Sequence, residues 1–453
     1  MFTGFHPMAK AIVLMAGAFV LSAAVTFAFI HARESRVSHE TPSEIPSATP
    51  PVAPAPVPTP REKTADVPAV VADYNAPPGR SPEMQVFDKA VLYLGAQQET
   101  DGHWSVAKSG GAAGFVNLSG DITLTAVCTA ALLDACSFKQ TNPEALRHAR
   151  LGLDWLTQHV SENGAIGDEH GPGEPMAAQI FSALTFLQAG DLSSRTSVRD
   201  NAAKLCRYAI GSMTAEPGGY GATAGAKAAR ADLTAWATVL FNQARSSYVP
   251  FYVAEPGKTE NEIANLEADT NHKTELSIRN ALKALQCEPK TSGAFARSSD
   301  RLEPDWDASV FALLTYAAFA DQSSTFKAGL TYVLGADYDP EKTQSIPGIT
   351  QHVAWGENGN GFSAQTLMAA SMLLFNVYGP EQRVFGIWTN SVTGLLTSHQ
   401  LPNGSWDAAG ADASLGRFWR TALNARLLVL LAPPQMPPPP PPVPQPGEPA
   451  PGQ

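Results

Sequence analysis

The sequence predicts an all-α fold in which about twelve helices form two concentric rings, an α6/α6 toroid. Two observations support this prediction: six almost wholly apolar segments recur along the chain, and six amphipathic segments of helical period alternate with them. A helix that is apolar on every side must be buried on all faces, whereas an amphipathic helix keeps one face in water. An inner ring of apolar helices inside an outer ring of amphipathic helices satisfies both kinds.

The apolar segments recur with a period of about 55 residues, which is typical of a repeat architecture. Six equivalent positions mark their starts: Asp121, Pro175, Asp232, Trp306, Phe362 and Phe418. The spacings between these starts are 54, 57, 74, 56 and 56 residues. The long interval contains residues 246–272, which we expect to form an inserted loop, and no segment of the chain has a strand pattern.

The helices are expected in alternating order along the chain. The amphipathic, outer helices are predicted at residues 83–98, 143–160, 197–213, 274–287, 323–335 and 381–400. The apolar, inner helices are predicted at residues 120–133, 173–187, 229–241, 303–319, 360–375 and 416–431.

Proline divides the chain into a folded body and two flanks. Of the 37 prolines, twelve fall between Pro42 and Pro82 and another twelve between Pro433 and Pro451. Such segments are stiff and extended and do not pack a core. We therefore predict a linker at 34–80, a folded body at 81–432 and a disordered tail at 433–453. The tail sequence "PPPPPPVPQP" suits docking in an aromatic groove of a protein partner.

The N-terminal segment, residues 1–33, is predicted to be a membrane anchor. Residues 11–30 carry no charge, and twenty such residues match the length of a helix that crosses a bilayer. A cleaved signal peptide is the alternative, although its apolar region is usually shorter. The anchor predicts a single-pass membrane protein whose body lies on the extracytoplasmic side.

Charge and motif content exclude several functions. The net charge is −11, from 31 basic and 42 acidic side chains, which opposes binding to nucleic acid. No phosphate-binding loop or dinucleotide fingerprint is found, so no cofactor is predicted. The four cysteines are set among apolar helical residues, which favours buried thiols.

Two turns share the pattern Gln, three residues, Gly, one residue, Trp. Their residues are Gln98, Gly102 and Trp104, and Gln400, Gly404 and Trp406. We interpret them as structural: the glutamine bonds the last carbonyls of its own helix, the glycine takes a positive φ, and the tryptophan packs on the neighbouring hairpin. Segments after Gln158 and Gln286 keep the glutamine but displace the glycine and lose the tryptophan.

These turns, the hairpin repeats and inner segments such as "GDITLTAVCTAALL" resemble the prenyltransferase and squalene-oxidase repeat proteins. Relatives in that family include squalene-hopene cyclases and protein prenyltransferase β-subunits. The resemblance covers residues 81–432. It implies an α/α toroid with a central cavity for an isoprenoid, and it says less about chemistry than about fold.

The family's catalytic motifs are incomplete. The cyclases protonate an alkene with an Asp-x-Asp-Asp run at the start of an inner helix, and "EPDWDASVFALL" places Asp307 at the proton donor, Asp305 at its first neighbour and Ala308 at the final aspartate. Capping of the helix N-terminus is the alternative role for these carboxylates. The zinc ligands of the prenyltransferases would fall on Asp305, Asp307 and Arg420, so no metal site is predicted.

Candidate ligand-binding residues follow from the ring, because its inner helices all begin at the same end. A pocket with a few polar groups on an apolar lining is expected there. The candidates are Asp121, Asp232, Trp236, Trp306, Gln365, Phe418, Trp419 and Arg420. Arg417 and Arg420 are the cations expected to pair with the carboxylates.

The leading functional hypothesis is a membrane-tethered toroid that binds an apolar, isoprenoid-like or other lipid, or a peptide, in its central cavity without the family's catalysis. One alternative is a degenerate terpenoid cyclase with Asp307 as proton donor. A second alternative is a protein-interaction scaffold that acts through the proline-rich tail.

Overall fold

The computed structural model describes residues 71, 74–76, 80–137, 142–167, 175–192, 195–247, 249, 258–336, 338–339, 346, 363–408 and 410–432. The predicted anchor, the tail and most of the linker lie outside these residues, as does Phe362. Membrane crossing and a partner for the tail therefore stay predictions.

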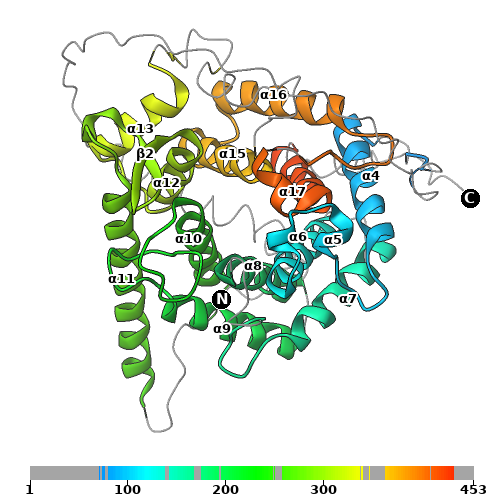
Figure 1. Ribbon diagram of the computed structural model, residues 1–453, viewed down its shortest axis with the longest axis horizontal. Coiled ribbons are helices and arrows are strands. Elements are labelled where there is room, and N and C mark those ends of the chain that lie inside the picture. Colours follow the sequence, from blue (N-terminus) through cyan, green and yellow to red (C-terminus); the bar gives the residue numbers. More distant parts are fainter. Residues whose placement is uncertain are drawn as a thin grey trace, which may run out of the picture.

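In the described part of the chain, six helices form a closed inner ring, and Figure 1 shows it around the centre of the body. They are α6 (Leu118–Ser137), α8 (Pro175–Leu192), α10 (Ala231–Ser246), α12 (Trp306–Ala318), α15 (Ala364–Tyr378) and α17 (Gly416–Leu431). Each packs against the next, and α17 packs against α6. Burial on all sides follows from the apolar sequences: α8 is buried without interruption from Met176 to Gly190.

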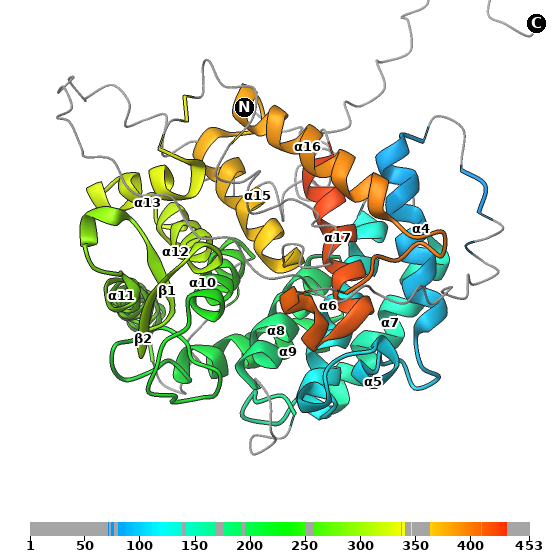
Figure 2. The same ribbon diagram turned by 45° about the horizontal axis from the view of Figure 1, so that its top comes forward.

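Six amphipathic helices among the described residues surround this ring. They are α4 (Pro82–Gln97), α7 (Pro143–Gln158), α9 (Thr196–Gly211), α11 (Glu260–Leu285), α13 (Ser324–Leu334) and α16 (Arg383–His399). Each contacts its inner neighbour, and α16 also contacts α17 and α4, which completes the outer ring (Figure 2). The predicted α/α toroid is confirmed.

Two local predictions are wrong. Strands β1 (Phe295–Ser298) and β2 (Arg301–Asp305) pair as an antiparallel hairpin where no strand was expected. Short strands on the rim have too few residues for a visible alternation. The predicted inserted loop also becomes helical from Glu260, because Thr259 and Glu262 form a reciprocal capping box.

Short helical turns join the longer elements. These are α5 (Val106–Ser109), η2 (Ala113–Phe115), η3 (Lys290–Ser292) and η4 (Gly410–Ser414). Both α5 and η2 lie in the connection from α4 to α6, and η4 directly precedes α17.

The folded body begins before the predicted boundary at residue 81. Val71 is 3% exposed and belongs to the core. The Tyr74 hydroxyl donates a hydrogen bond to Asp88 Oδ2 at 2.9 Å, and Arg80 forms an ion pair with the same aspartate of α4. A tyrosine and an arginine at the end of the proline-rich segment thus attach it to the ring.

One described helix is long and apolar enough to cross a membrane. It is the stretch Leu118–Cys136 in α6, and 89% of its most apolar window is buried inside the body. Because α6 is surrounded by inner and outer helices, its apolar surface serves the core of the ring.

The turns with Gln98 and Gln400 join neighbouring outer helices. Gln98 Nε2 donates to the carbonyl of Gly102 and, at 2.9 Å, to that of His148 in α7. Gln400 Nε2 donates to the carbonyls of Gly404 and, at 2.8 Å, of Val86 in α4. The predicted bond to the last carbonyls of the glutamine's own helix is therefore wrong.

The tryptophans of these turns take the role expected of the glutamines. Trp104 Nε1 donates to Leu94 O at 2.8 Å, and Trp406 Nε1 donates to Leu396 O at 2.9 Å, each in the last turn of the preceding outer helix. Both indoles are fully buried. Each tryptophan thus satisfies a helix end while it fills the space between hairpins.

The same turn geometry recurs at five junctions in the described chain. A glycine with positive φ lies so close to the neighbouring outer helix that a Cβ would come within 2.4 Å of a carbonyl oxygen. The pairs are Gly102 with Leu151, Gly164 with Lys204, Gly218 with Ser277, Gly293 with Ala328, and Gly404 with Lys89. The turns near Gln158 and Gln286 that looked decayed in sequence keep this contact.

A second bond at each junction reaches the inner ring. The residue two positions after the glycine donates its backbone N–H to a side chain of an inner helix. The pairs are Trp104 with Thr125, Ile166 with Gln179, Tyr220 with Thr234, Phe295 with Ser309, and Trp406 with Thr421. Each turn therefore fixes its neighbouring outer helix and its own inner helix at once.

A buried polar cluster connects three neighbouring inner helices near their C-terminal ends. Arg426 Nε donates to Asp134 Oδ2 at 2.9 Å, and Gln188 Nε2 donates to the other oxygen of Asp134 at 2.6 Å. Burial raises the pKa of Asp134, although Arg426 and Gln188 act in the opposite direction. This cluster holds α6, α8 and α17 together at the end where the inner helices finish.

The junction glycines give a test of the ring. We expect Gly102→Ala and Gly404→Ala to lower the free energy of unfolding by more than Gly110→Ala, since Gly110 also has a positive φ but has open space at its Cβ position. Gly110→Ala, the control, should lower the free energy of unfolding by about 1–2 kcal/mol because of backbone strain. The two junction variants should lower it by about 1–3 kcal/mol more because the new Cβ clashes with the carbonyl. Urea unfolding measures the three values. Equal losses would show that the close contact does not contribute.

Candidate functional site

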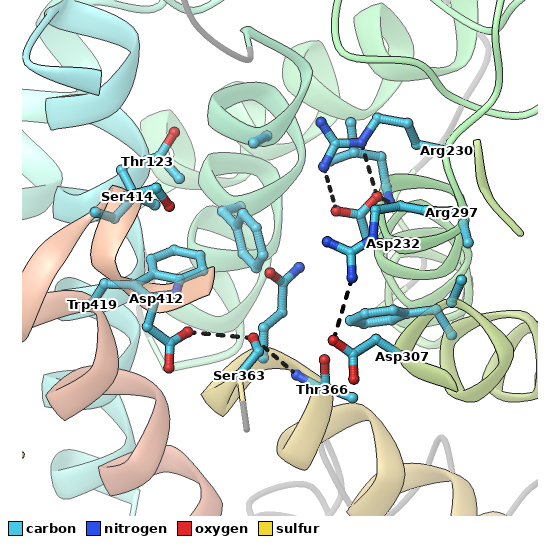
Figure 3. A pocket seen from close by; sticks show the side chains of 18 of the residues that line it. Thr123, Arg230, Asp232, Arg297, Asp307, Ser363, Thr366, Asp412, Ser414 and Trp419 are labelled. Carbon is cyan, nitrogen blue, oxygen red and sulfur yellow. Dashed lines mark hydrogen bonds and ion pairs between the residues drawn. The ribbon is translucent and has the colours of Figure 1, made fainter. Parts of the chain in front are cut away.

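A cavity of about 300 Å³ opens where the inner helices begin (Figure 3). All six inner helices contribute residues from their first two turns or from the residues just before them. The lining comprises Phe115, Thr123, Ala177, Phe181, Arg230, Ala231, Asp232, Leu233, Arg297, Asp307, Ala308, Phe311, Ser363, Gln365, Thr366, Asp412, Ser414, Leu415 and Trp419. The expectation that the helix starts gather around one pocket therefore matches the geometry.

Four of the residues selected from sequence line the cavity: Asp232, Gln365, Trp419 and Asp307. The other selected residues lie in different surroundings. Neighbouring residues on a helix point about 100° apart, so a helix start cannot direct a run of consecutive side chains into one cavity.

Trp306 and Phe418 illustrate this separation. Trp306 lies next to Asp307 but turns outward, and its Nε1 donates to Val333 O in α13 at 3.4 Å. Phe418 lies next to Trp419 but packs edge-on against Tyr93 of α4, with ring centroids 6.0 Å apart. Both were wrongly selected as cavity residues, and both serve contacts between the two rings.

Three further candidates lie behind or beside the cavity wall. Asp121 accepts a hydrogen bond from Val106 N at 2.7 Å and so holds the start of α5. Trp236 is buried beneath Phe181, with ring centroids 5.5 Å apart. Arg420 is fully buried. None of the three belongs to the lining.

Asp305 is the N-cap of α12. Its Oδ1 accepts the backbone N–H of Ala308 at 2.7 Å, and its Oδ2 pairs with Arg297 Nη2 at 3.0 Å. The capping alternative thus describes Asp305, which stands outside the lining, whereas Asp307 reaches the cavity. The two carboxylates of this short motif have different positions and partners.

Asp307 lies in the cavity wall with about a third of its side chain exposed. Loss of hydration raises its pKa to about 6, and the nearby negative charges of Asp305 and Asp412 act in the same direction. Arg297 Nη2, 3.4 Å from Asp307 Oδ2, lowers the pKa but does not cancel these effects. A carboxyl group with this pKa can hold or release a proton near neutral pH.

Asp412 in η4 is the second titratable group of the cavity, and it is almost fully buried. It accepts the backbone N–H of Ala364 at 2.9 Å and a hydrogen bond from Ser363 Oγ at 3.3 Å. Arg420 Nε lies 3.7 Å away. Burial raises the pKa of Asp412 to about 6 against these stabilising contacts. A lone aspartate in the loop "GADAS" gave no sequence signal for this role.

The cavity also contains two guanidinium groups that were not selected from sequence. Arg230 forms an ion pair with Asp232 at 2.7 Å, and Arg297 reaches Asp305 and Asp307 from β1. The expectation that Arg417 would pair with a carboxylate of the cavity is wrong, since it pairs with Asp407, outside the lining, at 2.6 Å. Arg297 was missed because it lies on the unexpected hairpin.

Aromatic side chains form part of the wall. Phe181 meets Trp419 edge to face, with ring centroids 5.3 Å apart. Such faces pack against apolar stems and attract cations. The cavity therefore joins charged groups of both signs to an aromatic surface.

Metal-binding geometry is not found in the described part of the chain. No group of three or more histidine, cysteine, aspartate or glutamate side chains there could hold a metal ion. The carboxylates of the cavity are bonded to arginines and to backbone N–H groups instead.

Comparisons with known proteins give little beyond the fold. No family model matches the sequence, and no curated protein matches it. Solved structures that match include an inactive variant of an alpha-1,6-mannanase of Salegentibacter sp. in complex with alpha-1,6-mannotriose, with 10% identity, a TM-score of 0.49, and coverage of 77% of this chain and 98% of that chain.

Two other solved structures are similar at the same level. A novel alpha-amylase from Clostridium perfringens has 10% identity and a TM-score of 0.42, with 79% of this chain and 99% of that chain covered. A protein from Actinoplanes has 12% identity and a TM-score of 0.41, with 77% and 98% covered. The resemblance to the prenyltransferase and squalene-oxidase repeat family stays a prediction.

The two raised pKa values predict how stability depends on pH. Each group binds its proton more tightly in the folded state than in the unfolded chain, where an aspartate has a pKa of about 3.9. The protonated forms of Asp307 and Asp412 therefore contribute stability to the fold below about pH 4, and this stability is lost as the pH rises to about 6. For the buried Asp412 the loss is about 3 kcal/mol, and for the partly exposed Asp307 it is smaller.

Asp412→Asn provides the measurement, because an asparagine cannot titrate. In urea unfolding, we expect the free energy of unfolding of this variant, minus that of the unmodified protein, to increase between pH 4 and pH 7. The size of this difference at any single pH does not enter the test. A constant difference over this range would contradict the raised pKa of Asp412.

Proposed function

We propose that the protein is a binding module that takes a small polar ligand, of the size of a short peptide segment, in the cavity at the start of the inner ring. The observation that carries this proposal is the lining of the cavity: three carboxylates, two guanidinium groups and an aromatic wall around about 300 Å³. Convergent polar groups on a partly apolar surface are typical of ligand sites.

Of the ligands expected from sequence, this lining favours a peptide over an isoprenoid. A hydrocarbon chain would remove water from Asp307, Asp412 and Arg297 without offering hydrogen bonds in return, and such desolvation costs free energy. The volume is also at the lower end of the range for ligand pockets. Amide, hydroxyl or charged groups of a peptide would replace the lost water.

We further propose that residues 11–30 tether the ring to a membrane, with the body on the extracytoplasmic side. Outer helix α4 runs antiparallel to the inner helices, since Tyr93 near its end contacts Phe418 at the start of α17. The chain thus enters α4 and leaves α17 on the face opposite the cavity. A cavity that faces away from the tether supports a ligand that arrives from water.

Native mass spectrometry of the full chain in detergent, with an equimolar mixture of tripeptides and with squalene in a separate sample, tests the proposal. We expect tripeptides to be retained and squalene not. Gln365→Ala removes a side chain of the lining and should weaken retention about tenfold, the loss expected for one good hydrogen bond. Asn280→Ala, in a groove on the outside of the ring, is the matched control. Retention of squalene instead of tripeptides would overturn the proposal.

A second candidate function is a degenerate terpenoid cyclase with Asp307 as proton donor. The observation that favours it is the pKa of about 6, which desolvation and the neighbouring Asp305 give this carboxyl group. Ala308, which takes the place of the family's final aspartate, also lines the cavity and offers no proton. Asp307 would therefore have to act without that neighbour.

Incubation of the full chain with squalene or shorter polyprenes tests this candidate. Cyclic products should form and should disappear in Asp307→Asn, while Asp269→Asn on the exposed part of α11 should leave them unchanged. A folded protein that gives no cyclic product would exclude the cyclase.

A further inference from the structure

The cavity has carboxylates on opposite walls. Asp307 at the start of α12 and Asp412 in η4 face it from two sides, with the start of α15 between them (Figure 3). Among the described residues, the charged side chains of the lining are three carboxylates and two guanidinium groups. Buried carboxylates of this kind are stabilised by a cation that brings hydrogen bonds.

A cation of the protein already lies beside Asp307. Arg297 extends from β1 over the cavity, and its Nη2 lies 3.0 Å from Asp305 Oδ2 and 3.4 Å from Asp307 Oδ2. Its side chain is 55% exposed. Strong pairs between a guanidinium and a carboxylate have shorter distances, and exposed pairs contribute little to stability. The contact between Arg297 and Asp307 is therefore one that a better-placed cation can displace.

The wall beside Asp412 suits the remainder of such a ligand. Trp419 and Phe181 form a buried aromatic surface between α17 and α8. An alkyl stem can pack on this surface, and a cation can lie over its rings. Arg230 stays paired with Asp232 and so does not compete for Asp307.

We infer that the cavity recognises a guanidinium or alkylammonium group, as carried by an arginine or lysine side chain of a peptide, and that this group takes the place of Arg297 at Asp307. This inference rests on the proposed peptide-binding function and names the group that is recognised. Arg297 then acts as a displaceable counter-ion, which sets specificity by competing with the ligand.

Calorimetric titration of the full chain with N-acetylarginine methylamide and with its neutral isostere N-acetylcitrulline methylamide tests the inference. We expect the arginine compound to bind at least about tenfold more tightly, the gain of one hydrogen-bonded charge contact. Asp307→Asn should remove this preference. Arg297→Ala should strengthen binding of the arginine compound by up to about fivefold, the value of an exposed ion pair, and leave the citrulline compound unchanged.

If Arg297 has only a structural role, we expect the opposite result for Arg297→Ala. Its removal would then weaken binding of both compounds, and Arg297→Gln, which keeps most of the side chain, would restore it. That outcome, or equal binding of the two compounds to the unmodified protein, overturns the inference. If the two compounds bind equally and Gln365→Ala still weakens their binding, the proposed peptide site stands and only the inference about the cation fails. If neither compound nor the tripeptide mixture binds, the peptide site and the inference both fail. Circular dichroism shows that each variant is folded.

Discussion

The ring depends on one repeated contact, in which a turn glycine lies directly against a carbonyl of the next outer helix. At Gly102 a Cβ atom would lie 2.4 Å from Leu151 O, and at Gly404 it would lie 2.4 Å from Lys89 O. No other residue type fits such a position, because the φ is positive and the space is filled. The contact fixes the distance between hairpins, and since the contact at Gly404 joins the last turn to α4, it also closes the ring.

Closure of the ring creates the candidate functional site. Inner helices that are held side by side and in the same direction begin at one end, where their first N–H groups and their positive dipole ends meet. The protein places carboxylates there: Asp305 caps α12, and Asp412 accepts the first N–H of α15. Burial raises the pKa of Asp412 and that of Asp307, whereas the hydrogen bond from Ala364 N–H lowers the pKa of Asp412. Loss of water therefore outweighs the helix N-terminus in setting the charge of this cavity.

The resemblance to isoprenoid enzymes implies an apolar ligand, whereas the polar lining of the cavity favours a polar one. An apolar cavity with a dry acid would suit a hydrocarbon substrate, but here Arg297 and Arg230 reach into the same space as the carboxylates. Charged walls of both signs suit a ligand that offers its own hydrogen bonds and charge. Function is therefore argued from the side chains of this lining and not from the fold.

Periodicity in the sequence was enough to predict the two rings, because burial of an apolar helix depends on composition and hardly on its neighbours. It also predicted that Asp232, Asp307, Gln365 and Trp419 lie at the start of the inner ring. Which of two adjacent residues enters the cavity was not predictable: Trp306 and Phe418 turn away by one helical step, and this depends on the rotation of each packed helix. Arg297 and Asp412 come from a short hairpin and a loop, which have no period. Arg297 reaches Asp307 only because the β1–β2 hairpin folds back onto the start of α12. Asp412, more than a hundred residues further along the chain, faces the same cavity only because the ring brings η4 next to the start of α12.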